Sequence, residues 1–157
     1  MTIYVDLDGV LADFDAAAEA ILGTNNIYKY EFIWGADKFW QKLNTKPKFF
    51  RELPKKHDAD RLWSAIKHLK PTILTALPRE NPERVAEQKQ DWVAKHFYGT
   101  DVITCQTKDK PNYCKPGDVL IDDRAVNRDA WIKAGGTYLI HENSGQTVAA
   151  LKALGII

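Results

Sequence analysis

The sequence has few cysteines, no long apolar run and almost no net charge. Only Cys105 and Cys114 are cysteines, which is too few for a disulfide-rich secreted chain or for a cysteine-based metal clip. No segment approaches the about 18 apolar residues of a membrane span. The N-terminal segment meets an acidic residue at Asp6, which excludes a signal peptide there. We therefore expect a cytoplasmic protein with two reduced thiols and no membrane partner.

The charge balance argues against a polymeric anion as a stable partner. The chain has 22 Lys and Arg residues against 21 Asp and Glu residues, a formal net charge of +1. It thus has no overall field that would hold a nucleic-acid backbone, and a charged partner must be recognised locally. With 157 residues the chain is long enough for one domain with a small insertion. A small-molecule substrate is the favoured partner.

Short β-branched runs alternate with longer segments of helical periodicity. The runs lack a polar face, as strands buried on both sides do. They are Ile3-Tyr4-Val5, Thr72-Ile73-Leu74, Val102-Ile103-Thr104, Val119-Leu120-Ile121 and 137–140. Helical stripes run through 62–69 and 85–97, Asn81-Pro82 predicts a capped helix start, and Gly135-Gly136 predicts a helix stop. This alternation predicts an α/β fold with a parallel sheet of about five strands.

One connection is too long for a simple crossover. About sixty-five residues separate the first strand from the second, and this stretch is rich in Phe and Trp. We interpret it as helix, insertion, helix, with a small helical cap at 25–53. The core domain would then consist of 1–24 and 54–157.

Two acidic pairs follow predicted strands. Asp6 and Asp8 follow the first strand, where they can point the same way, and Gly9 then permits a sharp turn. Asp122 and Asp123 follow the fourth strand. Each pair alone could simply cap the next helix, but both together form a plausible all-oxygen magnesium site. Open α/β sheets bind their ligands at this edge.

Thr75 and several lysines are weaker candidates for phosphate binding. Thr75 ends the second strand, although threonine is also simply a good strand former. Lys108, Lys110 and Lys115 lie between the third and fourth strands, in a loop that could equally be solvated surface. Lys89 lies on an apolar helix stripe, where it either faces a phosphate or extends to the helix edge.

The motifs together resemble the haloacid dehalogenase-like phosphatase superfamily. Asp6-Leu7-Asp8-Gly9-Val10-Leu11-Ala12-Asp13 resembles its first motif, Thr75 its second, a lysine near 110 its third and Asp122-Asp123 its fourth. The sequence segments 49–54, 75–78 and 89–93 are similar to the corresponding segments of the 5′(3′)-deoxyribonucleotidases and of their short phage and bacterial relatives. The resemblance covers nearly the whole chain and is weakest at 23–46. It implies a three-layer Rossmann-like core with a small helical cap after the first strand.

The resemblance also implies a mechanism. Asp6 would attack phosphorus and form an aspartyl-phosphate, and Asp8 would act as general acid and then base. Magnesium would be held by Asp6, the Asp8 backbone carbonyl and Asp122, with Asp123 as a water-mediated ligand or a support. Thr75 and the third-motif lysine, Lys110 or else Lys115, would bind the phosphoryl oxygens. The family has a lysine near the phosphate at the position of Lys89.

Substrate recognition is expected at the cap. Phe14 and Phe50 match family positions that line a base pocket, and the resemblance places Ala76 at the substrate. Trp34 and Trp40 are candidates from composition alone, and all these aromatics could simply form a cap core. The predicted function is a Mg²⁺-dependent 5′-nucleotidase acting on nucleoside monophosphates. The alternatives are a phosphatase for another small ester or a nucleic-acid end, and a non-catalytic nucleotide-binding module. A homodimer is compatible with the relatives.

Overall fold

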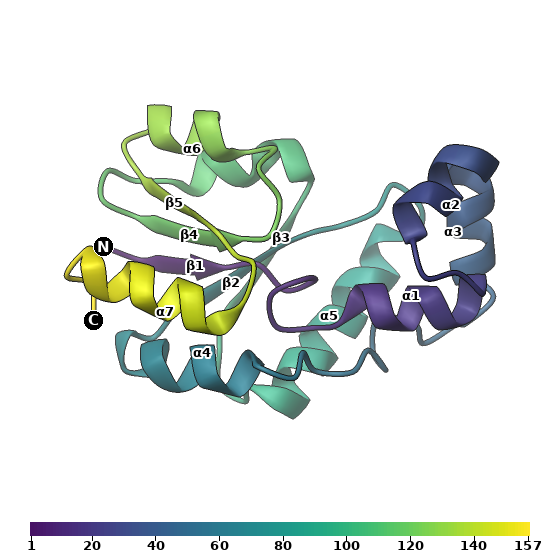
Figure 1. The fold of residues 1–157 in the computed structure, drawn as a ribbon, viewed down its shortest axis with the longest axis horizontal. Helices are drawn as coiled ribbons and strands as arrows, with labels where there is room; N and C mark the ends of the chain where they lie inside the picture. Colours follow the sequence, from purple (N-terminus) through teal and green to yellow (C-terminus); the bar gives the residue numbers. More distant parts are fainter.

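The computed structural model describes residues 1–157 and confirms the predicted α/β architecture (Figure 1). The strands are β1 Ile3–Val5, β2 Thr72–Ala76, β3 Val102–Cys105, β4 Val119–Asp122 and β5 Thr137–Ile140. The α-helices are α1 Phe14–Leu22, α2 Ile27–Trp34, α3 Ala36–Leu43, α4 Ala59–Ile66, α5 Pro82–His96, α6 Arg128–Lys133 and α7 Ser144–Ala153. Two 3₁₀ helices are η1 Lys67–Leu69 and η2 Thr107–Tyr113. No helix has both the length and the apolar character that crossing a membrane requires.

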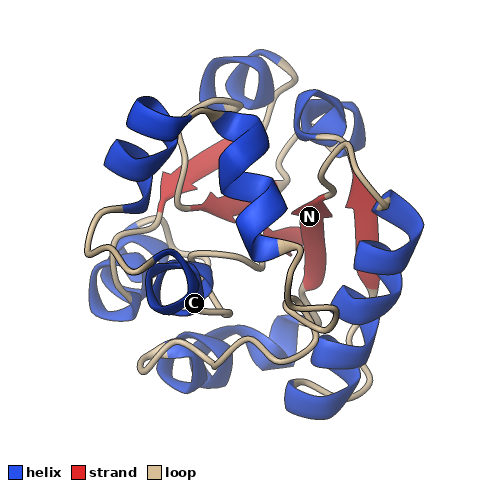
Figure 2. Ribbon diagram, turned by 90° about the vertical axis from the view of Figure 1, so that its right-hand side faces the viewer, coloured by secondary structure: helices blue, strands red, loops and turns tan.

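All five strands are parallel and lie in the order β3-β2-β1-β4-β5. Side chains alternate between the two faces of the sheet. Ile3 and Val5 of β1 belong to the large apolar core, which also contains side chains of α4, α5 and α7. Tyr4 faces the other way and packs in a smaller cluster with Trp131 of α6. Helices therefore cover both faces, as Figures 1 and 2 show, and the sheet is the middle of three layers.

The helix boundaries differ in detail from the expected ones. Pro82 does occupy the first turn of α5, but Asn81 adopts a left-handed conformation (φ 50°) and its side chain makes no capping hydrogen bond. The lysine-rich segment predicted as a loop contains η2, in which Lys110 is buried. Asn127 Nδ2 donates to the Thr107 carbonyl over 2.9 Å, which ties the start of η2 to the segment before α6.

The structure places α1 with the inserted helices. α1 packs against α2 and α3, and Figure 1 shows the three helices together, beyond the carboxyl ends of the strands. The sequence analysis expected the core to extend to residue 24, because a helix commonly packs on the sheet after its first strand. We therefore propose that the cap comprises residues 14–53, and we use the word in that sense below.

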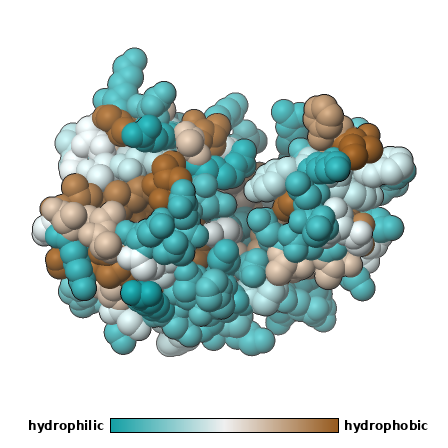
Figure 3. All heavy atoms as spheres, viewed as in Figure 1, coloured by the Kyte–Doolittle hydropathy of each residue, from teal (hydrophilic) through white to brown (hydrophobic).

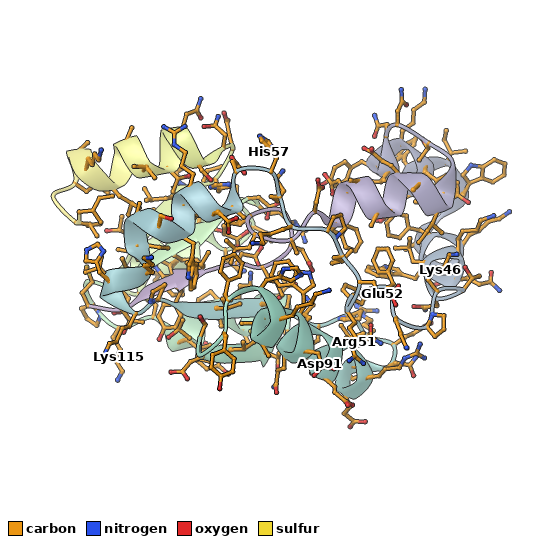
Figure 4. All side chains as sticks on the ribbon, turned by 90° about the horizontal axis from the view of Figure 1, so that it is seen from below. Lys46, Arg51, Glu52, His57, Asp91 and Lys115 are labelled. Atoms are coloured by element: carbon orange, nitrogen blue, oxygen red, sulfur yellow. The ribbon has the colours of Figure 1, made fainter.

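Two adjacent chain segments connect the cap to the core. The Asp13 amide donates to the Pro54 carbonyl and the Lys56 amide donates to the Leu11 carbonyl, each over 2.8 Å. On the α5 side, Trp92 Nε1 donates to the Leu53 carbonyl over 2.7 Å. Figure 4 shows Arg51 of the cap beside Asp91 of α5, and their charged groups lie 3.8 Å apart. The cap is therefore fixed at its base, over the carboxyl edge of the sheet.

Candidate active site

A cavity of about 460 Å³ lies between the cap and the carboxyl ends of the strands. Figure 3 shows the surface hollowed between the two parts. The strand register explains why the acidic pairs meet here: Val5 of β1 pairs with Ile121 of β4, so Asp6 and Asp122 follow neighbouring strands. The site residues that line this cavity are Asp6, Asp8, Phe14, Trp40, Phe50, Thr75, Ala76, Lys89, Lys110, Asp122 and Asp123.

Three carboxylates form a compact group at the cavity floor. Oxygens of Asp6, Asp122 and Asp123 lie within 4.8 Å of one another. Asp6 is 7% exposed and Asp122 is 2% exposed, and Asp123 Oδ1 is buried without a hydrogen-bond partner. Burial and the charges of Asp6 and Asp122 raise the pKa of Asp123 above its ordinary value. Clustered carboxylates with a free buried oxygen are suited to a hard divalent cation such as Mg²⁺.

Lys110 partly neutralises this group. Its Nζ lies 3.1 Å from Asp6 Oδ1 and 3.0 Å from Asp122 Oδ2. Burial opposes the charge of the ammonium group, but the two carboxylates outweigh it and raise the pKa of Lys110 above its usual value. Lys110 therefore remains charged beside Asp6, where it can contact a phosphoryl oxygen.

Lys89 is the second buried cation. It is 2% exposed, and its Nζ donates to Asp8 Oδ2 (3.0 Å), Thr75 Oγ1 (2.8 Å) and the Ala76 carbonyl (2.6 Å). It also lies 5.3 Å from the centre of the Phe50 ring. Of the two interpretations of Lys89, the structure favours the one in which it faces the site, because the side chain does not reach the helix edge.

The charges in the site do not balance. The carboxylates of Asp6, Asp8, Asp122 and Asp123 carry four negative charges when ionised, and Lys89 and Lys110 carry two positive charges. Asp15, Glu31 and Arg124 also line the cavity, so its carboxylates outnumber its cationic side chains six to three, and a divalent cation would reduce this excess of negative charge. With such a cation bound, the two lysines are free to attract an anionic substrate group.

Gly9 is needed at the turn after β1. It has φ +84°, and a Cβ atom at this position would lie 2.1 Å from Asp123 Oδ2. Residues with side chains rarely adopt this φ, and this contact would additionally displace Asp123. The backbone at Gly9 can therefore approach Asp123 closely, because residue 9 has no side chain.

We predict that Gly9→Ala lowers kcat/KM at least about tenfold, since Asp123 must move away from its neighbours. Gly99→Ala is the matched control, because Gly99 has the same φ of +84° and no atom within 4 Å of its added Cβ. Gly99→Ala should lose about 1 kcal/mol in free energy of unfolding because of its φ, and Gly9→Ala should lose more because of the added contact with Asp123, as measured by denaturant titration. Equal activity of the two variants would show that the Asp123 contact is unimportant.

Aromatic rings of the cap form one wall of the cavity. The Phe14 ring lies 6.1 Å from both Trp40 and Phe50, and Trp40 and Phe50 are stacked 6.5 Å apart with an interplanar angle of 21°. Phe49 packs edge-on against Phe14, and Phe39, which also lines the cavity, packs edge-on against Trp40. This wall offers flat apolar faces to a ring-shaped group.

Two predicted residues are not brought to the cavity. Trp34 is 54% exposed, packs against Tyr30 and does not line the cavity, so the structure does not support its assignment to substrate binding. Lys115 is exposed, and Figure 4 shows it at the end of the core away from the cap. The geometry therefore favours Lys110 over Lys115 as the third-motif lysine.

The sequence analysis missed several lining residues. They are Asp15, Ile27, Tyr28, Glu31, Phe39, Leu77, Pro78, Thr107, Arg124, Val126 and Asn127. Asp15 and Arg124 stand next to recognised motifs, so proximity in sequence was a usable signal for them. Nothing in the sequence marks Tyr28 or Glu31, because the orientation of α2 decides which of its residues face inward.

Comparison with known proteins identifies one matching protein family. The model of the family described as 5′ nucleotidase, deoxy (pyrimidine), cytosolic type C protein matches residues 1–144. A search of curated proteins found no significant match.

Similar solved structures share the fold. A hydrolase from Streptococcus pneumoniae TIGR4 has a TM-score of 0.60 and 17% identity, covering 98% of this chain and 97% of its own. A HAD-superfamily hydrolase from Ehrlichia chaffeensis has a TM-score of 0.54 and 15% identity, and the match covers 98% of this chain and 96% of that hydrolase. The L-2-haloacid dehalogenase from Xanthobacter autotrophicus has a TM-score of 0.54 and 14% identity, and the match covers 98% of this chain and 82% of the dehalogenase.

Proposed function

The chain belongs to the family of 5′ nucleotidase, deoxy (pyrimidine), cytosolic type C proteins and is a phosphatase-type hydrolase, and we propose that it is a Mg²⁺-dependent 5′-nucleotidase that hydrolyses nucleoside monophosphates through an aspartyl-phosphate. The observation that carries this proposal is the convergence of Asp6, Asp8, Thr75, Lys110 and Asp122 on one cavity with an aromatic wall. The cytosolic type in the family description supports the predicted cytoplasmic location.

In the first step, a carboxylate oxygen of Asp6 attacks phosphorus while the bond from phosphorus to the ribose 5′ oxygen breaks. Asp8 gives the departing oxygen a proton, so the nucleoside leaves as an alcohol. Lys89 Nζ, 3.0 Å from Asp8 Oδ2, stabilises the carboxylate that Asp8 becomes. Asp8 Oδ1 has no partner in the chain and is available for this transfer.

In the second step, Asp8 takes a proton from a water molecule whose oxygen attacks phosphorus. The bond between Asp6 and phosphorus breaks, which releases inorganic phosphate and restores the Asp6 carboxylate and the protonated Asp8. Thr75 and Lys110 bind the phosphoryl oxygens as charge moves between the entering and leaving groups.

The floor of the cavity fits a magnesium ion. Asp6 and Asp122 would be its carboxylate ligands and the Asp8 carbonyl a further one, while Asp123 would bind through water or orient the other ligands. When bound, the ion withdraws charge from the phosphoryl oxygens and allows the anionic Asp6 to approach phosphorus. The unpartnered, buried Asp123 Oδ1 supports this assignment, because such an atom is costly without a donor or a cation.

A phosphate-release panel tests the substrate class. We expect deoxynucleoside 5′-monophosphates to have a kcat/KM about 10–100-fold above that of deoxyribose 5-phosphate, because stacking on an aromatic wall contributes about 1–3 kcal/mol per base. Trp40→Ala should reduce this ratio about tenfold. Trp34→Ala, the same change on the cap outside the cavity, should leave it unchanged. A ratio near one in the wild type would instead favour a phosphatase for other small esters.

A further inference from the structure

The charged side chains that the cap presents to the cavity, Asp15 and Glu31, are both carboxylates. Among cap residues that line the cavity, only Asp15, Tyr28 and Glu31 are polar. The positively charged lining residues, Lys89, Lys110 and Arg124, all come from the core. A substrate group that reaches the cap therefore meets carboxylates and a hydroxyl beside the aromatic rings, and no ammonium, guanidinium or amide side chain.

α2 orients two of these residues. Ile27, Tyr28 and Glu31 are spaced i, i+1 and i+4, so they lie on one face of the helix, and all three line the cavity. Burial and the negative charges of Asp15, Asp123 and Glu31 raise the pKa of the Tyr28 phenol, although the charge of Arg124 opposes them. Tyr28 is 67% exposed, so this residue lies at the open side of the cavity.

The carboxylate of Glu31 is uncommitted. It forms no hydrogen bond or ion pair with any other side chain or with the backbone. An ionised carboxylate only accepts hydrogen bonds, so it favours a ligand edge that offers donors. It also disfavours an edge of carbonyl oxygens, whose lone pairs would face its own.

Nucleobases differ in this respect. Adenine, cytosine and guanine carry an exocyclic amino group, and guanine adds an adjacent ring N–H. Uracil and thymine offer one ring N–H flanked by two carbonyl oxygens. A single accepting side chain at the base end of the cavity can therefore separate the two groups of bases.

We propose that Glu31 is a specificity-determining residue that selects nucleotides with an amino-bearing base over those with uracil or thymine. The inference rests on the proposed nucleotidase activity and adds the substrate class. The base lies against Trp40 and Phe50, and its amino group donates to the Glu31 carboxylate. α2 lies within 23–46, where the resemblance to the deoxyribonucleotidases is weakest, so base preference is expected to be set by this chain's own residues.

The test compares kcat/KM for dAMP, dCMP, dGMP, dTMP and dUMP in the wild type and in Glu31→Gln. We expect the wild type to favour at least one amino-bearing nucleotide about tenfold over dUMP and dTMP, as a hydrogen bond to a charged group allows. The amide that replaces the carboxylate both donates and accepts, so the variant should lose most of this preference, mainly through faster hydrolysis of dUMP and dTMP.

Glu52→Gln is the matched control, because Glu52 is an exposed cap carboxylate that does not line the cavity, and its substitution should leave the base profile unchanged. A wild type that prefers dUMP or dTMP would overturn the inference, as would a Glu31→Gln profile parallel to that of the wild type. Hydrolysis of none of the five nucleotides, with sugar phosphates still hydrolysed, would overturn the proposed function itself.

Discussion

Asp6→Asn should abolish phosphate release, with a loss of kcat of about 10⁴-fold or more. The amide is nearly the same size as the carboxylate, but it is a poor nucleophile and a weak metal ligand. The amide can keep the side-chain oxygen that accepts from the Leu7 backbone N–H over 2.8 Å, so the turn after β1 should survive. We expect the melting temperature to change by less than about 5 °C.

Asp101→Asn is the matched control for this prediction. Asp101 is exposed, lies before β3 and makes no side-chain hydrogen bond, so the substitution should preserve both activity and stability. Phosphate release should be measured together with thermal unfolding, which separates loss of the nucleophile from loss of the fold. An Asp6→Asn variant with activity near that of the wild type would end the covalent mechanism.

Removal of divalent cations should have the second large effect. A chelator should lower kcat about 10³-fold, because the carboxylates of the cavity floor would then repel the phosphate, and added Mg²⁺ should restore the activity. Asp122→Asn should raise the Mg²⁺ concentration for half-maximal activity about 10–100-fold. Magnesium titrations of activity and of melting temperature test both expectations.

The melting temperature gives an independent measure of binding. A cation that binds only the folded chain stabilises it, so Mg²⁺ should raise the melting temperature of the wild type. The increase should be smaller in Asp122→Asn and unchanged in Asp101→Asn. If a chelator changed neither the activity nor the melting temperature, the cation would have no part in the mechanism and Asp122 would not be its ligand.

The central sheet could be predicted from sequence because its signals are local. Each strand is a short β-branched run without a polar face, and all five are found where expected. Parallel strands place their carboxyl ends at one edge, so the two acidic pairs were expected to meet. The proximity of Asp6, Asp122 and Asp123 agrees with that expectation.

Residues outside the strands were harder to place, because three-dimensional packing decides their orientation. Distance along the chain could not separate Lys110 from Lys115, since it does not reveal that η2 turns Lys110 inward. For Lys89, the apolar stripe indicated burial but not its three hydrogen-bond acceptors.

The cap was the least predictable part. α2 has the sequence IYKYEFIW, which is apolar around most of its circumference, so periodicity could not show which side faces the cavity. Tyr28 and Glu31 line the cavity although both are exposed, whereas the exposed Phe32 and Trp34 do not line it. The cap start that we propose, at α1, differs from the expected one because the turn at Gly9 redirects the chain before α1 begins. The homodimer stays a prediction.

The central claim is that Asp6 becomes phosphorylated during turnover. Wild-type protein with Mg²⁺ and a hydrolysed nucleotide should be quenched in acid within one turnover and analysed by peptide mass spectrometry. We expect one phosphoryl group on Asp6, removable by hydroxylamine as an acyl phosphate should be, and none on the Asp6→Asn variant. Phosphate released at full rate with no phosphorylated peptide at any quench time, or with the phosphoryl group on a different residue, would contradict the account.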